Sequence, residues 1–169
     1  MTRMSCFHAY CFKSLSVFAA LLLLAGCSTL SPYSTLTKLD LTLAASDQLN
    51  PDLHGRPSPI VVRLIELKNP VAFENADFFS LYERPKETLA PDLVTSEELE
   101  LRPGESLDLK LSVDSGSRYV GVLAAYRDLP ETKWRYVVQL TPVERTHATL
   151  RLDQAGIHNA LAYLDKAGD

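Results

Sequence analysis

Cys27 is the residue whose surroundings most clearly predict a chemical reaction. It follows an apolar run of 11 residues, Leu15 to Ala25, interrupted only by Ser16, and then one glycine. Arg3 and Lys13 put positive charge ahead of the run, which is the order of a secretory signal. The run is too short to span a bilayer, which takes about 20 apolar residues. We therefore expect the chain to be exported.

The segment Leu24-Ala25-Gly26-Cys27 resembles the lipobox of bacterial lipoproteins. The resemblance implies that residues 1–26 are a signal peptide and that the thiol of Cys27 forms a thioether to lipid and receives acyl chains. The stretch ahead of the apolar run is long and holds Cys6 and Cys11, which leaves Met1 and Met4 as alternative translation starts. Two chains already anchor a protein stably, at about 0.8 kcal/mol for each buried CH₂ group. Ser28 stands where aspartate would imply retention in the inner membrane, so we expect the outer membrane, with the domain facing the periplasm. The alternative is an ordinary signal peptide followed by a chance cysteine.

The other groups able to do chemistry do not form a recognisable site. Three histidines follow the signal: His54, His147 and His158. None has metal-ligand spacing, so surface or turn roles are the simpler interpretation. Three aspartates would have to be gathered by the fold to act as an acid/base or calcium set: Asp47, Asp52 and Asp77. Turns and helix caps are the commoner uses of aspartate. The chain has no nucleophile elbow and no phosphate-binding loop. We predict no catalytic residue, no metal site and no cofactor.

Size and charge narrow the class of protein further. Removal of residues 1–26 leaves 143 residues, enough for one domain with its own core. This part has 15 basic and 21 acidic residues, a formal charge of −6. Nucleic-acid binding needs clustered lysine and arginine, so we expect no nucleic-acid partner.

The elements that must position any functional loop are mostly strands. Residues 27–37 are rich in serine and threonine, so we interpret them as the lipidated cysteine and a tether. Apolar side chains then alternate with polar ones, or run continuously, in six segments: 39–43, 59–67, 107–113, 119–126, 134–140 and 148–152. Residues 99–101 are a further short candidate, and 157–164 fit a strand or a helix. The pattern predicts a mainly β domain over 38–169, a two-sheet β-sandwich.

One stretch, about residues 70–98, departs from the strand pattern and predicts a small helical insertion. Asn69 can cap a helix whose first residue is Pro70. Phe78, Leu81 and Tyr82 then recur at helical spacing. The polar part from Lys86 to Glu98 predicts two helical turns at most.

The loop between the first two expected strands is the best candidate for a binding surface. It runs from Gln48 to Ser58 and is long for such a connection, which is often a sign of function. Its prolines and glycine set the backbone at fixed points. The alternative is a merely tolerated surface loop. The candidate binding residues are Asn50, Pro51, Asp52, Leu53, His54, Gly55, Arg56 and Pro57.

The chain resembles the TssJ (SciN, VasD) lipoprotein family of the bacterial type VI secretion system. Six stretches carry the resemblance: Asn50-Pro51-Asp52, Arg56 to Arg63, Phe73 to Tyr82, Leu101 to Glu105, Gly121 to Leu129, and Trp134-Arg135. It implies a transthyretin-like β-sandwich with added helices. It also implies binding to the periplasmic C-terminal region of TssM, and through TssM an indirect association with TssL. The family's partner contact maps onto the loop at residues 49–58, with Asp52, Leu53, His54 and Arg56 as the foremost candidates.

Two other functions remain open at this point. A small ligand or a cell-wall fragment could bind a groove or the aromatic side chains. An envelope enzyme would have to use Glu74, Asp77 or His54. The first predicts a ligand that copurifies with the domain, and the second predicts activity that a single substitution removes.

Overall fold

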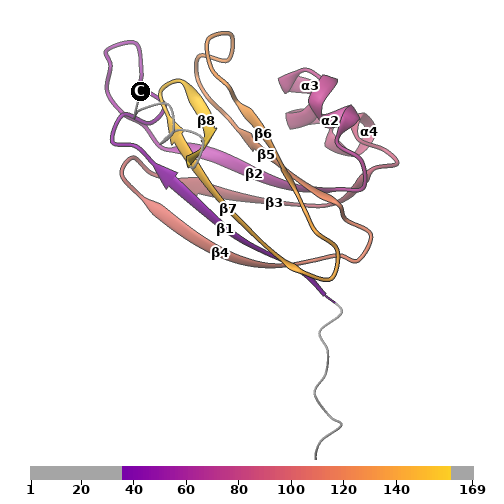
Figure 1. Ribbon diagram of the computed structural model, residues 1–169. Coiled ribbons are helices and arrows are strands. Elements are labelled where there is room, and N and C mark those ends of the chain that lie inside the picture. Colours follow the sequence, from indigo (N-terminus) through magenta and orange to yellow (C-terminus); the bar gives the residue numbers. More distant parts are fainter. Residues whose placement is uncertain (1–35, 161–169) are drawn as a thin grey trace, which may run out of the picture. The chain divides into compact units, whose positions relative to one another are not determined.

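The computed structural model describes residues 36–160, which fold into a β-sandwich with a helical segment on one face (Figure 1). The predicted lipid attachment at Cys27 and the signal peptide lie outside the described residues. The elements in chain order are β1 (Thr37–Ala45), β2 (Ile60–Leu67), α2 (Val71–Asn75), α3 (Phe78–Glu83), α4 (Pro85–Thr88), β3 (Leu93–Leu101), β4 (Ser106–Val113), β5 (Tyr119–Ala124), β6 (Arg135–Gln139), β7 (Arg145–Asp153) and β8 (Gly156–Asn159).

Each sheet of the described domain has four strands. One has the order β4-β1-β7-β8, with β1 antiparallel to β4 and parallel to β7. The other has the order β3-β2-β5-β6 and is antiparallel throughout. The prediction of a mainly β, two-sheet sandwich is therefore confirmed.

The core between the sheets follows from the alternation of apolar residues. Leu39, Leu41 and Leu43 of β1 are buried because every second side chain of a strand points to the same face. On β2 both faces are covered. Val62 packs between the sheets, whereas Ile65 packs under the helices.

The helical segment covers the outer face of the second sheet (Figure 1). Phe73, Leu81 and Leu89 are fully buried there in a second, smaller core. Two arginines of the sheet also hold the segment. Arg63 donates to the carbonyl of Tyr82 at 2.7 Å. Arg135 donates to the carbonyls of Phe73 at 2.9 Å and Ala76 at 2.6 Å.

Asp77 starts α3, because its carboxylate accepts the backbone N–H of Ser80 at 3.0 Å and the Ser80 hydroxyl at 2.6 Å. The apolar helix face predicted from Phe78, Leu81 and Tyr82 is only partly buried. Leu81 is fully buried, whereas Phe78 stacks on Tyr82 with ring centroids 5.3 Å apart. Asn69 acts at the start of α2, where its side chain accepts the N–H of Val71 at 3.0 Å.

The predicted extent of the helical insertion, residues 70–98, is wrong at its C-terminal end. The helices end at Thr88, and Leu93–Leu101 form β3, paired with β2 from Ile60 to Leu67. The error has a physical reason. β3 is an edge strand whose residues 95–98 are all exposed, so the apolar alternation of a half-buried strand is absent. Charged residues on such an edge protect it from pairing with other chains.

Three smaller boundaries also differ from expectation. Thr37 belongs to β1 and is buried, so the expected tether over 27–37 is one residue too long. Trp134 lies just before β6 and not in it. The ambiguous C-terminal segment begins as the strand β8, and residues 161–164 lie outside the described part.

The connections fall at two opposite ends of the sandwich. At one end lie the start of β1, the β4–β5 turn and the β6–β7 turn, because Thr37 pairs with Val113 and the N–H of Lys38 donates to Glu144. We call it the tether end, since the preceding chain enters there. The β1–β2 and β5–β6 loops lie at the other end. A nine-residue strand such as β1 spans about 30 Å between them.

Candidate functional site

The base of the β1–β2 loop is held by Asn50, which is almost completely buried. Its side-chain amide donates to the carbonyl of Pro59 at 3.1 Å, and its side-chain carbonyl accepts the N–H of Arg127 at 3.0 Å. Asn50 has φ of 45°, a left-handed conformation that asparagine tolerates better than most residues. Leu49 is buried in the core just before it. The base of the loop is therefore closed just before β2 and fixed to the β5–β6 loop.

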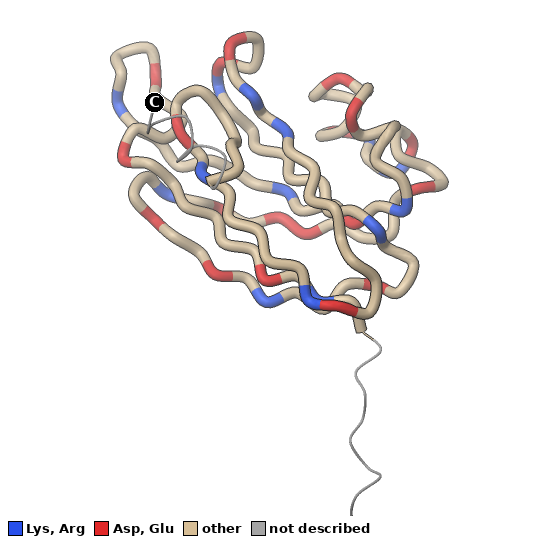
Figure 2. The backbone as a smooth tube through the Cα atoms, in the orientation of Figure 1, with Lys and Arg blue, Asp and Glu red and all other residues tan. Residues whose placement is uncertain are grey.

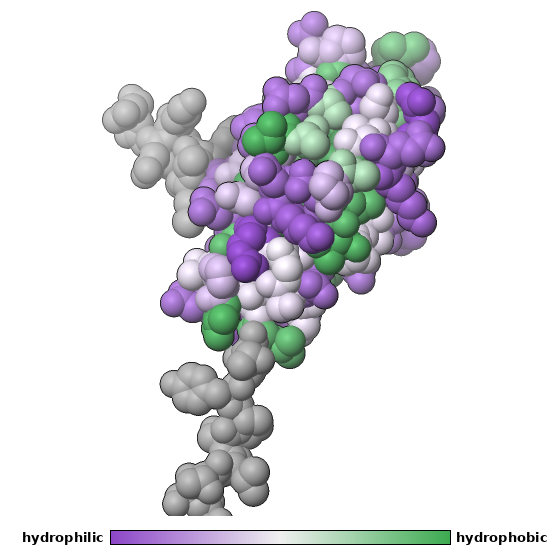
Figure 3. Space-filling model, turned by 90° about the vertical axis from the view of Figure 1, so that its right-hand side faces the viewer, coloured by the Kyte–Doolittle hydropathy of each residue, from purple (hydrophilic) through white to green (hydrophobic). Residues whose placement is uncertain are grey.

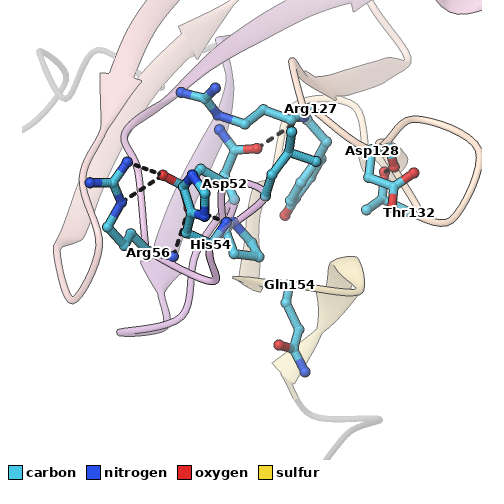
Figure 4. Close-up of a pocket in the computed structure, with 11 residues that line it drawn as sticks. Asp52, His54, Arg56, Arg127, Asp128, Thr132 and Gln154 are labelled. Atoms are coloured by element: carbon cyan, nitrogen blue, oxygen red, sulfur yellow. Dashed lines mark hydrogen bonds and ion pairs between the residues drawn. The ribbon is translucent and has the colours of Figure 1, made fainter.

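The tip of the loop is a closed turn built around Asp52 (Figure 4). One carboxylate oxygen accepts the N–H groups of His54 at 2.8 Å and Arg56 at 3.0 Å. The other oxygen accepts the Arg56 guanidinium, with Nη2 at 2.7 Å. Gly55 supplies the positive φ of 75° that the turn requires.

These contacts also set the charge of the turn. Hydrogen bonds from the backbone N–H and then the guanidinium of Arg56 hold the pKa of the Asp52 carboxyl below its usual value. The carboxylate is thus ionised at neutral pH and largely neutralised by Arg56. The turn presents a fixed shape rather than a free acidic group.

Leu53 is the residue that this turn displays, and its side chain is fully exposed. Burial of a leucine side chain against a partner is worth about 1.5–3 kcal/mol. A rigid turn that holds one apolar side chain in solvent therefore has an energetic reason to bind another surface.

The β5–β6 and β7–β8 loops lie opposite the turn. Together with the β1–β2 loop they line an open hollow of about 730 Å³. Its lining residues beyond the β1–β2 loop are Tyr126, Arg127, Asp128, Thr132 and Gln154. Figure 4 shows Gln154 on the β7–β8 side, and Asp128 and Thr132 on the β5–β6 loop. Arg127 and Asp128 are exposed, so charges of both signs border the hollow.

Tyr126 forms part of the wall of the hollow and is almost completely buried. Its hydroxyl has no hydrogen-bond partner among the described residues. Burial, and to a lesser extent the charge of Asp153, raise the pKa of this phenol well above its usual value. The hydroxyl is therefore protonated throughout the physiological range.

The structure brings most of the predicted loop residues to the hollow. Six of the eight predicted residues line it: Asn50, Pro51, Asp52, Leu53, His54 and Arg56. Gly55 and Pro57 shape the loop without lining the hollow. Sequence reasoning missed the β5–β6 and β7–β8 contributions. The contribution of the β5–β6 loop could have been suspected from the charged pair Arg127-Asp128, which directly follows the apolar segment 119–126.

The other candidate groups stay apart from this site. The side chain of His147 lies 3.6 Å from Asp40, and that of His158 lies 3.5 Å from Asp153. Within residues 36–160, no group of three or more histidine, cysteine, aspartate or glutamate side chains is placed to hold a metal ion. Over the same range, no helix is long and apolar enough to cross a membrane.

A model of one protein family matches residues 37–155 of the chain. The family is T6SS-SciN, described as type VI secretion lipoprotein, VasD, EvfM, TssJ. The chain belongs to this family. It is thereby assigned to the membrane-associated lipoproteins of type VI secretion. No curated protein sequence matches the chain.

Solved structures of this class are similar to the chain over nearly their whole length. The T6SS lipoprotein TssJ1 from Pseudomonas aeruginosa is 36% identical, with a TM-score of 0.71, over 73% of this chain and 94% of TssJ1. Serratia marcescens Lip, a membrane-bound component of the Type VI Secretion System, is 27% identical, with a TM-score of 0.68, over 73% and 97%. A chain of a Type VI membrane complex is 26% identical, with a TM-score of 0.65, over 73% and 98%.

Proposed function

We propose that this lipoprotein is a non-enzymatic assembly component, anchored in the outer membrane through Cys27. Its β1–β2 loop binds the periplasmic C-terminal region of TssM, and TssM in turn links it to TssL. The observation that carries the proposal is the loop itself: a turn closed by Asp52 and Arg56, fixed at its base by Asn50, that holds Leu53 fully in solvent.

Preorganisation favours binding by this loop. A flexible loop loses conformational freedom when it binds, and that loss reduces affinity. Here the conformation is already set by hydrogen bonds at the tip and the base. Binding energy gained at Leu53 is therefore not spent on ordering the loop.

The geometry of the domain supports the same role. The preceding chain enters at the tether end, and the loop lies at the opposite end, about 30 Å away. The nine residues from Ser28 to Leu36 add at most about 30–32 Å when extended. A lipid on Cys27 would leave the loop free to face a partner that reaches across the periplasm from the inner membrane.

Calorimetric titration tests the proposal directly. The soluble domain beginning at Ser28 is titrated with the periplasmic C-terminal region of TssM from the same genome. We expect saturable binding of micromolar affinity or tighter, weakened about tenfold or more by Leu53→Ala. Phe79→Ala removes another exposed apolar side chain, on α3, and is the matched control that leaves the affinity unchanged. An affinity unchanged by Leu53→Ala would mean that the binding site lies elsewhere on the domain. The absence of any binding would refute TssM as the partner.

A second function is favoured by one observation, the hollow with the buried hydroxyl of Tyr126 in its wall. A small ligand or cell-wall fragment with a polar group would fit such a place. Mass spectrometry of the purified domain, denatured to release bound molecules, distinguishes the two functions. A stoichiometric ligand, together with no binding of TssM, would favour the second.

A further inference from the structure

The tether end of the domain displays two apolar side chains. Leu36 is 50% exposed and Val143, in the β6–β7 turn, is 58% exposed. Their backbones lie close together, because the backbone N–H of Val143 donates to the side-chain hydroxyl of Thr37, the residue after Leu36, at 3.0 Å. Figure 3 shows apolar side chains at the lower edge of the described domain. We call Leu36 and Val143 the apolar tip.

Val143 is an unfavourable residue for the free domain. It is the third residue of the turn Thr141-Pro142-Val143-Glu144, in which the N–H of Glu144 donates to the carbonyl of Thr141. Its φ is 63°, which glycine or asparagine adopts readily and a β-branched residue does not. The side chain also remains largely in water. Such an outlier suggests a role for the side chain outside the free domain.

The charges near the apolar tip do not select a charged partner. Both signs are present at this end, so neither dominates: Lys38, Arg118 and Arg145 lie there with Glu66, Asp114 and Glu144. Figure 2 shows basic and acidic residues side by side where β1 begins. Arg118 is in addition held by the carbonyls of Ser115 and Ser117. A partner of this end would be recognised by apolar contact.

The short distance in sequence between Cys27 and the apolar tip indicates that this partner is the lipid bilayer. Cys27 precedes Leu36 by nine residues, so a lipid on Cys27 keeps this end within about 32 Å of the membrane. A tether of this length holds the apolar tip at a high effective concentration near the bilayer. Even a weak apolar contact then becomes populated.

We propose that the tether end rests on the bilayer, with Leu36 and Val143 inserted among the lipid headgroups. The inference depends on the lipid anchor of the proposed function and goes beyond it. The contact orients the domain, so that the β1–β2 loop points away from the membrane instead of sampling all directions.

Nitroxide labelling of the mature lipoprotein in vesicles tests the inference. The vesicles contain phosphatidylethanolamine with a minority of phosphatidylglycerol. The acylated Cys27 cannot react, so a single introduced cysteine carries the label. Thr141→Cys places it beside the apolar tip, and His54→Cys places it at the far loop; both positions are exposed. We expect the label at 141 to be several-fold less accessible to a water-soluble nickel complex, and more accessible to oxygen, than the label at 54. Equal accessibility on vesicle-bound protein would overturn the inference.

Substitutions separate lipid contact from folding. In the Thr141→Cys background, Val143→Gly should raise nickel accessibility several-fold while also raising the thermal midpoint, because glycine relieves the strained φ. Val143→Asn, which keeps a side chain, and Leu36→Ser should also raise the accessibility. Phe79→Ser, which removes an apolar side chain 60% exposed on α3, is the matched control and should leave it unchanged. Unchanged accessibility in both Val143 variants would overturn the inference.

Two further outcomes distinguish the possible failures. Molar salt should leave the protection at 141 intact, since apolar contact is not screened. Loss of protection in salt would contradict the apolar mechanism. Protein that does not float with the vesicles would refute the lipid anchor, and with it both this inference and the anchoring part of the proposed function.

Discussion

Asn50→Ala should destabilise the domain by about 3 kcal/mol. Two side-chain hydrogen bonds are lost, to Pro59 and Arg127, each worth about 0.5–1.5 kcal/mol. Alanine must also adopt the left-handed φ of 45°, which adds about 1–2 kcal/mol. The loop base loses the bond that closes it before β2 and its attachment to the β5–β6 loop, so TssM binding should weaken as well.

Two further variants of Asn50 separate the loss of the hydrogen bonds from the cost of the left-handed backbone conformation. Asn50→Gly loses the same hydrogen bonds but adopts the positive φ without strain, so we expect a loss of about 2 kcal/mol. Asn50→Asp keeps an oxygen that can accept the N–H of Arg127, but it replaces the donor to Pro59 by a buried carboxylate oxygen facing that carbonyl, so it should also be less stable than wild type. Urea denaturation of the domain beginning at Ser28 measures all three. An alanine variant within about 0.5 kcal/mol of wild type, or a glycine variant less stable than alanine, would refute the reasoning.

Three further predictions follow from the packing and the charges. Gly121→Ala would put a Cβ 2.9 Å from the buried ring of Phe73, so denaturation should show a loss of about 1–3 kcal/mol, partly recovered by adding Phe73→Leu. Tyr126→Phe removes an unpartnered buried hydroxyl, so the free domain should keep or gain stability; a clear loss would reveal a hidden partner. Hydrogen bonds lower the pKa values of Asp52 and Asp77 below 3.8, their value in the unfolded chain. The ionised carboxylates therefore stabilise the domain fully above that pH, and this contribution should be lost as the pH falls through the lowered pKa values. Denaturation measured across the acid range tests this.

The β-sandwich could be predicted from the sequence, because the alternation of apolar and polar residues indicates which side chains of a strand are buried. Leu39, Leu41 and Leu43 predict one face of β1, and the mostly apolar segment 60–67, with apolar residues on both faces, predicts a strand covered on both sides. β3 was not predictable in the same way. An edge strand carrying Glu97 and Glu98 on exposed positions has no apolar period, and only its pairing with β2 makes it a strand.

The site shows the same division. The prolines and the glycine indicated an ordered loop. The spacing of four residues between Asp52 and Arg56 was compatible with the ion pair that closes the turn. The part contributed by Tyr126 depends on long-range topology. Tyr126 lies in the β5–β6 loop, two residues after β5, and β5 must pair with β2 before this loop can meet the β1–β2 loop. The hydrogen bond between Arg127 and Asn50 joins residues 77 apart in the chain. No local pattern carries that information.

Photo-crosslinking in living cells tests the central claim, that the β1–β2 loop binds TssM, most directly. A photoreactive amino acid is placed at Leu53 in the full-length lipoprotein, and at Phe79 as the control, an exposed apolar residue on α3. Cells that produce TssM are irradiated, and crosslinked species are identified with antibodies and mass spectrometry. We predict a crosslink to the periplasmic C-terminal region of TssM from position 53 and none from position 79. A crosslink from 79 alone, or from neither position, would contradict the claim.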